Sequence, residues 1–145
     1  RLLADSHFLL GSYSEAYELY KIVASDYKHL HSYLNQAGAL EMLAACIAFD
    51  PAPRKELVNA LETAVKAYRS ASHPCTIFFV LRAFVRAADY CTANGIHHVA
   101  VGFLNKALLA VNSFEQSEPK LQSKFDALTA PILERLGVCH SLYSA

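Results

Sequence analysis

The chain has 145 residues, a length that suits one folded domain with a real hydrophobic core. Hydrophobic residues make up 54% of it and charged residues 18%, so it is more apolar than an average soluble domain. Thirteen basic residues balance thirteen acidic ones without a run of like charge, which argues against a nucleic-acid partner or a polybasic membrane patch. The apolar excess instead predicts surfaces that another protein covers.

Helical periodicity runs through the first third of the chain. A first helix over residues 2–10 is expected to end at Gly11, a residue that suits the left-handed turn after a helix. Ser12 or Ser14 then caps a second helix, which carries its tyrosines on one stripe. A third helix, rich in small residues, is expected over about 31–49. These elements predict closely packed helical hairpins.

The rest of the chain is divided by prolines and one glycine. Four further helices are expected, over residues 54–71, 72–94 and 96–114 and from 117 onward. A loop with two prolines at residues 51–53 precedes them, Pro74 lies in the first turn of the fifth helix, and Gly95 ends it. Ser117 is the expected cap of the seventh helix, which Pro131 should kink or split. We therefore predict an all-α fold of about seven antiparallel helices.

The residues around Gly11 and Gly95 resemble the tetratricopeptide repeat, a helix pair of about 34 residues in which small residues face aromatic ones. The positions that fit are Ala4, Phe8, Gly11, Tyr13, Ala16 and Tyr20 around the first glycine, and Gly95, Ala100 and Ala107 around the second. We assign all of them structural packing roles in a tetratricopeptide-like α-solenoid that covers residues 1–145 as a single segment. A plain helical bundle is the alternative. Because the chain begins with Arg1 rather than methionine, we expect it to be excised from a longer protein.

We expect no catalytic, cofactor-binding or metal-binding residues, and no enzyme. The sequence has no G-x-S-x-G, phosphate-binding loop or H-E-x-x-H motif. His97 and His98 are adjacent, and neighbouring residues of a helix point about 100° apart, so they do not share one ion easily. The four cysteines, Cys46, Cys75, Cys91 and Cys139, lie among apolar neighbours without a C-x-x-C motif and are predicted to be reduced and buried.

One helix face carries a candidate contact for a partner. In the expected fifth helix, Arg82, Arg86 and Asp89 form a polar stripe, and Phe79 lies on the same stripe three residues before Arg82. A large apolar residue on a polar face is typical of contact with another chain. We therefore predict Phe79, Arg82 and Arg86 as partner contacts. The alternative is that Phe79 packs beneath the seventh helix.

The first half of the chain carries a more specific resemblance. The run LADSHFLLGSYSEAYELYKIVASDYKHL at residues 3–30, followed by NQAGALEMLAACIAF at 35–49, resembles the subunit 8 family of the TRAPP (transport protein particle) tethering complexes. In that family a similar helix pair leads into an AGALEMAA-like helix and then a proline-containing loop. Ala64 and the stretch Ala67-Tyr68-Arg69 continue the likeness, whereas from about Ser72 onward the pattern is only compatible with helix.

This resemblance implies a non-enzymatic α-solenoid scaffold without a cofactor. Members of the family look like scaffolds that attach to a smaller core, which activates a Rab-family GTPase. They direct the assembly to membranes in ER-to-Golgi transport and autophagy. The implied partners are the other subunits directly and the Rab-family GTPase indirectly. The implied location is cytoplasmic, peripheral to Golgi, ER-derived or autophagic membranes through the full complex. A free-standing tetratricopeptide-type adaptor that binds peptides is the alternative.

Overall fold

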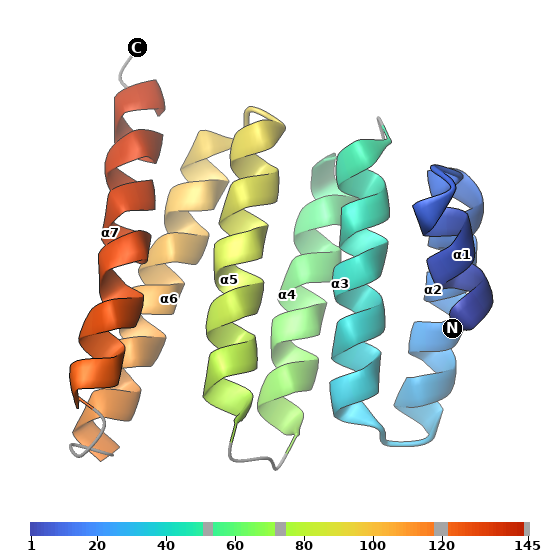
Figure 1. Ribbon diagram of the computed structural model, residues 1–145, viewed down its shortest axis with the longest axis horizontal. Coiled ribbons are helices and arrows are strands. Elements are labelled where there is room, and N and C mark those ends of the chain that lie inside the picture. The colour runs from blue at the N-terminus through green and yellow to red at the C-terminus, as the bar shows by residue number, and fades with distance from the viewer. Residues whose placement is uncertain (51–53, 72–74, 118–121, 144–145) are drawn as a thin grey trace. The chain divides into compact units, whose positions relative to one another are not determined.

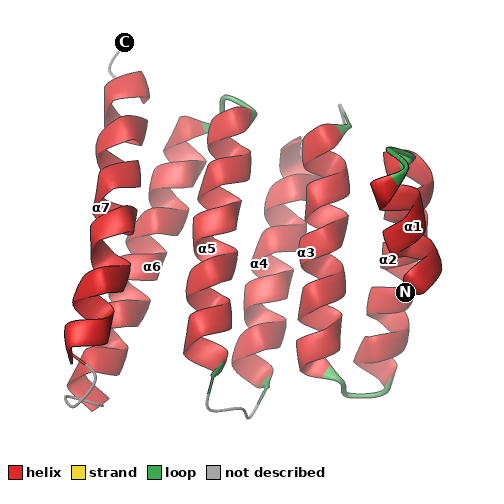
Figure 2. Cartoon of the chain, viewed as in Figure 1, coloured by secondary structure: helices red, strands yellow, loops and turns green. Residues whose placement is uncertain are grey.

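The computed structural model describes residues 1–50, 54–71, 75–117 and 122–143. Within these ranges the chain contains seven α-helices and no strand, so the prediction of an all-α fold is confirmed (Figure 2). The helices are α1 (Leu2–Leu9), α2 (Tyr13–His29), α3 (Tyr33–Phe49), α4 (Arg54–Ser70), α5 (Thr76–Ala93), α6 (His97–Ser117) and α7 (Gln122–Tyr143). The two-proline loop at 51–53, the predicted helix start at 72–74 and Pro119 lie outside the described residues.

The chain forms two compact units, Arg1–Thr76 and Ile77–Ala145. Unit 1 contains helices α1 to α4, and unit 2 contains α5 from its second residue onward together with α6 and α7. A single solenoid over residues 1–145 stays a prediction.

Unit 1 is a two-layered stack of helix pairs. Helices α1 and α3 lie in one layer and α2 and α4 in the other (Figure 1), and each helix packs on its neighbour in the sequence. The Phe8 ring of α1 meets the Phe49 ring at the end of α3, with centroids 6.0 Å apart. In the other layer the Tyr17 hydroxyl of α2 lies 3.3 Å from Glu56 Oε2 of α4. Helices two apart in the sequence thus lie side by side, as in a solenoid.

The core of unit 1 combines small residues with one large tyrosine. Ala4 is 1% exposed, and Ala16 and Tyr20 have no exposed surface. The alanines let the helix backbones approach closely, and the aromatic ring fills the space that remains. The buried Tyr20 hydroxyl donates a 2.5 Å hydrogen bond to Asp5 Oδ1, and this bond links α2 to α1.

Three turns between helices share one hydrogen-bond pattern. At the first, the Gly11 N–H donates to the Phe8 carbonyl and the Ser12 N–H to the His7 carbonyl. The same two bonds occur at His31 and Ser32 and again at Gly95 and Ile96. The middle residue of each turn has a positive φ, 77° at Gly11, 53° at His31 and 71° at Gly95. This is the left-handed helix stop called the Schellman motif.

The His31 turn corrects one predicted boundary. The third helix was expected from about residue 31, but α3 begins at Tyr33. His31 takes the left-handed conformation that ends α2, so it cannot also start the next helix.

Unit 2 repeats this arrangement with α5 and α7 side by side and α6 behind them (Figure 1). The Phe84 ring of α5 and the Phe103 ring of α6 have centroids 6.2 Å apart, and α6 packs on α7. Ala100 and Ala107 on α6 have no exposed surface, so their small size again allows close helix packing.

Three local expectations for unit 2 and its border need correction. An N-cap residue directly precedes the helix that it caps, so Ser117, which ends α6, does not cap α7, which begins at Gln122. Pro131 does not split α7, which runs from Gln122 to Tyr143, and a kink at Pro131 stays a prediction. Cys75, next to the start of α5, is exposed, whereas Cys46, Cys91 and Cys139 are buried as predicted. None of these four cysteines, all within the described ranges, forms a disulfide.

Candidate functional site

The predicted contact residues lie on the polar side of α5. The buried side of this helix carries Val80, Leu81, Ala83, Phe84, Ala87, Ala88 and Cys91. Arg82, Arg86 and Asp89 are exposed on the other side, and Phe79 is half-buried between the two. The guanidinium carbon of Arg82 lies 5.4 Å from the centre of the Phe79 ring, a cation–π contact.

A hollow of about 440 Å³ lies beside this stripe, between α5 and α7. We call it the α5–α7 groove. Its apolar lining consists of Phe78, Leu81 and Val85 from α5 and Pro131 and Ile132 from α7. Phe78 is 41% exposed, a high value for a phenylalanine, and Ile132 is buried. Phe78 therefore leaves part of the apolar lining of the groove exposed to water, whereas Ile132 lies beneath the surface.

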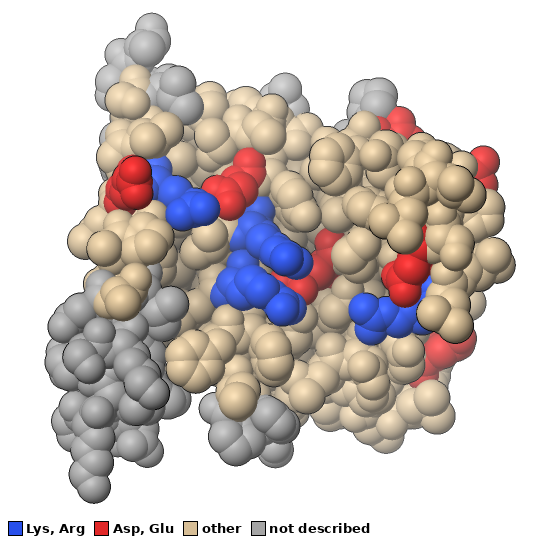
Figure 3. Space-filling view, in the orientation of Figure 1, with Lys and Arg blue, Asp and Glu red and all other residues tan. Residues whose placement is uncertain are grey.

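Four charged residues line the same groove, namely Arg82, Arg86, Asp89 and Arg135. Basic side chains gather over α5 on the face of unit 2 that Figure 3 shows. The structure thus brings the predicted Arg82 and Arg86 together in one site. The phenylalanine that lines this site with them is Phe78, whereas the sequence had indicated its neighbour Phe79.

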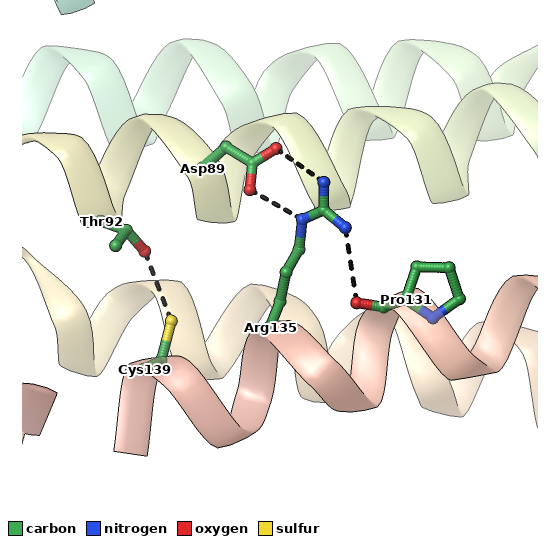
Figure 4. Close-up of polar contacts among 5 residues, drawn as sticks. All are labelled: Asp89, Thr92, Pro131, Arg135 and Cys139. Carbon is green, nitrogen blue, oxygen red and sulfur yellow. Dashed lines mark hydrogen bonds and ion pairs between the residues drawn. The ribbon is translucent and has the colours of Figure 1, made fainter. Parts of the chain in front are cut away.

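An ion pair between Asp89 and Arg135 crosses the groove (Figure 4). Arg135 Nε donates to Asp89 Oδ1 at 2.9 Å and Nη2 to Oδ2 at 3.5 Å, while Nη1 reaches the Pro131 carbonyl at 3.4 Å. The hydrogen bond to Asp89 raises the pKa of the Arg135 guanidinium above its ordinary value. The guanidinium therefore stays charged, and its hydrogen bonds hold Arg135 across the two helices.

A second hollow, of about 580 Å³, shares Asp89 and Arg135 with the groove. It continues on the side of the ion pair where Thr92 Oγ1 and Cys139 Sγ lie 3.4 Å apart (Figure 4). Its lining includes Glu134 as well as the ion pair. Arg82 and Arg86, in contrast, line only the hollow on the Phe78 side.

Unit 1 has a smaller hollow, of about 230 Å³, which residues of α2, α3 and α4 line. Its rim holds Tyr17, Glu56, Asn59 and Thr63. Burial, and then the negative charge of Glu56 beside it, raise the pKa of the Tyr17 phenol. Among the described residues that line this hollow there is an acidic side chain but no basic one.

The segments that carry the sequence resemblance are tied to one another inside unit 1. Tyr20 of AYELY bonds Asp5 of LADSHF, and Tyr68 donates to Glu41 Oε2 at 3.0 Å. Glu41 belongs to the ALEM block and is only 6% exposed. A buried carboxylate needs such a donor. These positions therefore identify the packing of the fold and leave its contact surface unspecified.

The family model of the ER-Golgi trafficking TRAPP I complex 85 kDa subunit (TRAPPC-Trs85) matches residues 1–95. The matched span is more than half of the 145 residues. The chain belongs to this family. The match covers unit 1 and α5, so it extends past Ser72, where the residues alone had shown only a compatible helical pattern. No curated protein and no solved structure matches the chain.

Membership of this family makes the chain part of a subunit of a multiprotein trafficking complex. None of the helices in the described ranges is both long and apolar enough to span a bilayer. The described His, Cys, Asp and Glu side chains include no group of three that could hold a metal ion.

Phe78 and Arg135 are among the groove residues that sequence reasoning missed. Phe78 carries a signal in the sequence, because it is a second phenylalanine next to the one that was chosen. Arg135 carries none, since only the packing of α7 places it opposite Asp89.

Proposed function

We propose that this chain is a scaffold segment of a TRAPP-type tethering subunit, of the subunit 8 type, that works by protein–protein contact and performs no catalysis. The family match over residues 1–95 carries this proposal. The subunit 8 assignment is supported by the resemblance of residues 3–49 to that family. A tetratricopeptide-like stack of helix pairs is the form in which such a scaffold presents its surfaces.

In this proposal the segment contacts other subunits directly and a Rab-family GTPase indirectly. The full complex then associates peripherally with Golgi, ER-derived or autophagic membranes on their cytoplasmic side. Neither a cofactor nor a nucleic acid takes part.

Exposed apolar residues at one end of unit 1 support a contact role. Leu9 and Leu10, where α1 ends, are 85% and 81% exposed, and Phe49 is 60% exposed. The Phe49 ring stacks on Tyr13 with centroids 5.3 Å apart, so part of an ordered aromatic group faces outward. Clustered apolar surface of this kind is typical of protein interfaces.

Affinity purification of the full-length protein that contains this chain tests the proposal. We expect TRAPP core subunits to be recovered with it, and their recovery to fall when residues 1–145 are deleted. Recovery of the full-length protein without any TRAPP core subunit would contradict the proposal.

The α5–α7 groove is the observation that favours the alternative, a free-standing adaptor that binds peptides. The same purification distinguishes the two functions, because an adaptor of that kind would bring down peptide-bearing partners in the absence of the TRAPP core.

A further inference from the structure

We propose that Asn94, in the turn between α5 and α6, is a site of spontaneous deamidation, and that opening of this turn controls the reaction. The product, aspartate or isoaspartate, closes the turn less well than asparagine does. Each reaction therefore leaves unit 2 with a permanently weakened connection between two of its helices. This inference does not depend on the proposed function.

Asn94 differs from the other asparagines of the chain in the residue that follows it. Glycine follows Asn94, whereas larger residues follow Asn35, Asn59, Asn105 and Asn112. Asparagine is chemically labile because the backbone nitrogen of the next residue can attack its side-chain amide carbon. Glycine has no Cβ to hinder this attack. Gly95 is exposed, and no atom lies within 4 Å of an added Cβ there, so water reaches the turn.

The reaction takes up water and releases ammonia. The Gly95 nitrogen loses its proton and forms a bond to Asn94 Cγ, while the bond from Cγ to Nδ2 breaks and ammonia leaves with that proton. Water then opens the resulting cyclic imide at either of its carbonyl carbons. Attack at Cγ gives aspartate, whereas attack at the backbone carbonyl carbon gives isoaspartate, in which the main chain runs through Cγ.

Hydrogen bonds of the folded turn hold both reacting groups. The Gly95 N–H donates to the Thr92 carbonyl at 3.0 Å, so the nitrogen keeps its proton in the closed turn. Asn94 Nδ2 donates to the Tyr90 carbonyl at 2.8 Å, which holds the side-chain amide against the last turn of α5. Attack requires both bonds to break. The reaction therefore proceeds from an opened form of the turn.

Ile96 is the residue that keeps this turn closed without taking part in the reaction. Its N–H donates to the Cys91 carbonyl at 2.7 Å, which is the longer-range bond of the Schellman motif. Its side chain is only 6% exposed, and Cys91 has no exposed surface. A smaller side chain at position 96 should therefore open the turn more often and speed up deamidation, while Asn94 and Gly95 stay unchanged.

Either product weakens the closed turn. A carboxylate at position 94 has no N–H to donate to the Tyr90 carbonyl. It also places a negative charge at the C-terminal end of α5, where the helix dipole disfavours it. Isoaspartate adds a main-chain carbon between Cys91 and Ile96, which changes the ring that their hydrogen bond closes. The modification therefore favours the opened form from which it arose.

Peptide mapping by mass spectrometry, after incubation of the full-length protein at neutral pH, tests the site and its control. We expect Asn94 to deamidate at least about tenfold faster in guanidinium-unfolded protein than in native protein. Asn112, which serine follows within α6, is the internal control and should convert far more slowly than Asn94 in the unfolded protein. Equal rates at Asn94 in the two states would overturn the control by the turn. Equal rates at Asn94 and Asn112 in the unfolded protein would overturn the site.

Two buried isoleucines distinguish opening of the turn from a general loss of stability. Ile96→Ala should raise the native rate at Asn94 at least about fivefold and leave the rate in guanidinium unchanged. The control Ile47→Ala truncates a side chain that is 4% exposed in unit 1, and it should leave the native rate at Asn94 within about twofold. Equal acceleration by both variants would contradict control by the turn. Ile96→Val replaces Ile96→Ala if circular dichroism shows that the alanine variant is unfolded.

Alkylation of buried thiols measures the consequence for unit 2. Protein in which Asn94 has been converted by long incubation should expose Cys91 to alkylation at a lower denaturant concentration than fresh protein does. Cys46, in unit 1, should change less. Asn94→Gln is the matched control, because its amide would have to close a larger ring, so its incubated and fresh samples should react alike. If conversion at Asn94 leaves Cys91 unchanged, the proposed weakening of unit 2 is wrong.

Discussion

Each unit places helices that are two apart in the sequence side by side, but the two pairs carry different surfaces. In unit 1, α2 and α4 are joined by Tyr17 and Glu56 over a hollow of about 230 Å³ with an acidic side chain. In unit 2, α5 and α7 are joined by Asp89 and Arg135 over a groove of about 440 Å³ with a basic rim. The two pairs share their side-by-side packing and differ in the charged residues that line their hollows.

The units also differ in the side-chain contacts that join their helices. In unit 1 two buried tyrosines donate hydrogen bonds to carboxylates, Tyr20 to the partly exposed Asp5 and Tyr68 to the buried Glu41. Unit 2 brings together the phenylalanines Phe84 and Phe103, and its Asp89–Arg135 pair is half-exposed. We therefore expect the removal of a polar contact to lower the stability of unit 1 more than that of unit 2.

The largest expected effect comes from Tyr20→Ala. The ring has no exposed surface, so its removal leaves a cavity and lowers the free energy of unfolding by about 3–5 kcal/mol. The measurement is alkylation of buried thiols during a urea titration. Burial raises the pKa of Cys46 in unit 1 and of Cys91 in unit 2 to about 11, so each thiol becomes reactive only when its own unit opens.

In the Tyr20→Ala variant, Cys46 should become reactive at a lower urea concentration while Cys91 changes less. Tyr20→Phe is the matched control, because it keeps the ring and removes only the bond to Asp5, which costs about 1 kcal/mol. Equal shifts at both cysteines would show that the units unfold together, and the distinction between them would fail.

Tyr68→Phe is expected to have the next largest effect. It removes the hydroxyl that donates to the buried Glu41, which lowers the free energy of unfolding by about 1–3 kcal/mol in urea denaturation. The control Tyr17→Phe removes a similar but exposed bond to Glu56 and should cost less than about 1 kcal/mol. If the two variants lose the same stability, burial of the carboxylate is not the cause.

The same substitution can be made at a turn glycine in each unit. Gly11→Ala and Gly95→Ala should each cost about 1–2 kcal/mol, because φ is positive at both while no atom lies within 4 Å of an added Cβ. The control Gly102→Ala lies in the interior of α6, also in open space, and should stabilise the chain by up to about 1 kcal/mol. A clear difference in cost between the two turns, measured by thermal unfolding, would argue against their common geometry.

Asp89→Asn should have the smallest effect on stability. Its side chain and that of Arg135 are 49% and 40% exposed, so we expect a loss of about 0.2–1 kcal/mol that shrinks as salt is added. Glu18→Gln, at an exposed position of α2, is the control and should change stability by less than about 0.5 kcal/mol. A loss that does not respond to salt would mean that Asp89 acts through packing.

Local signals in the sequence predicted most of the fold. The helices follow from apolar periodicity, and the turns at Gly11 and Gly95 follow from a residue that takes positive φ without strain. The turn at His31 was missed because histidine rarely takes that conformation. A comparison of LGSY at residues 10–13 with LHSY at 30–33 would have revealed it, since Leu, Ser and Tyr recur around the turn residue.

Only those groove residues that follow from the pattern of a single helix were predicted. Arg82 and Arg86 follow from the polar stripe of α5. The choice between Phe78 and Phe79 depends on how α5 is rotated against its neighbours, which the stripe does not determine. The partnership of Asp89 with Arg135, 46 residues further along the chain, depends on the register of α7 and is a tertiary property.

The hydrogen bond between Tyr20 and Asp5 also sets an alkaline limit for unit 1. Burial, and then the bond to Asp5, raise the pKa of the Tyr20 phenol above its ordinary value of 10.0. The folded unit therefore keeps a proton that the unfolded chain releases above pH 10, and this contribution to stability, complete below pH 10, is lost as the pH rises. Above pH 10 the free energy of unfolding of the native chain should fall by about 1.4 kcal/mol per pH unit more than that of the Tyr20→Phe variant, which has no phenol at this position. A contact that holds two helices together at neutral pH thus makes the fold sensitive to strong base.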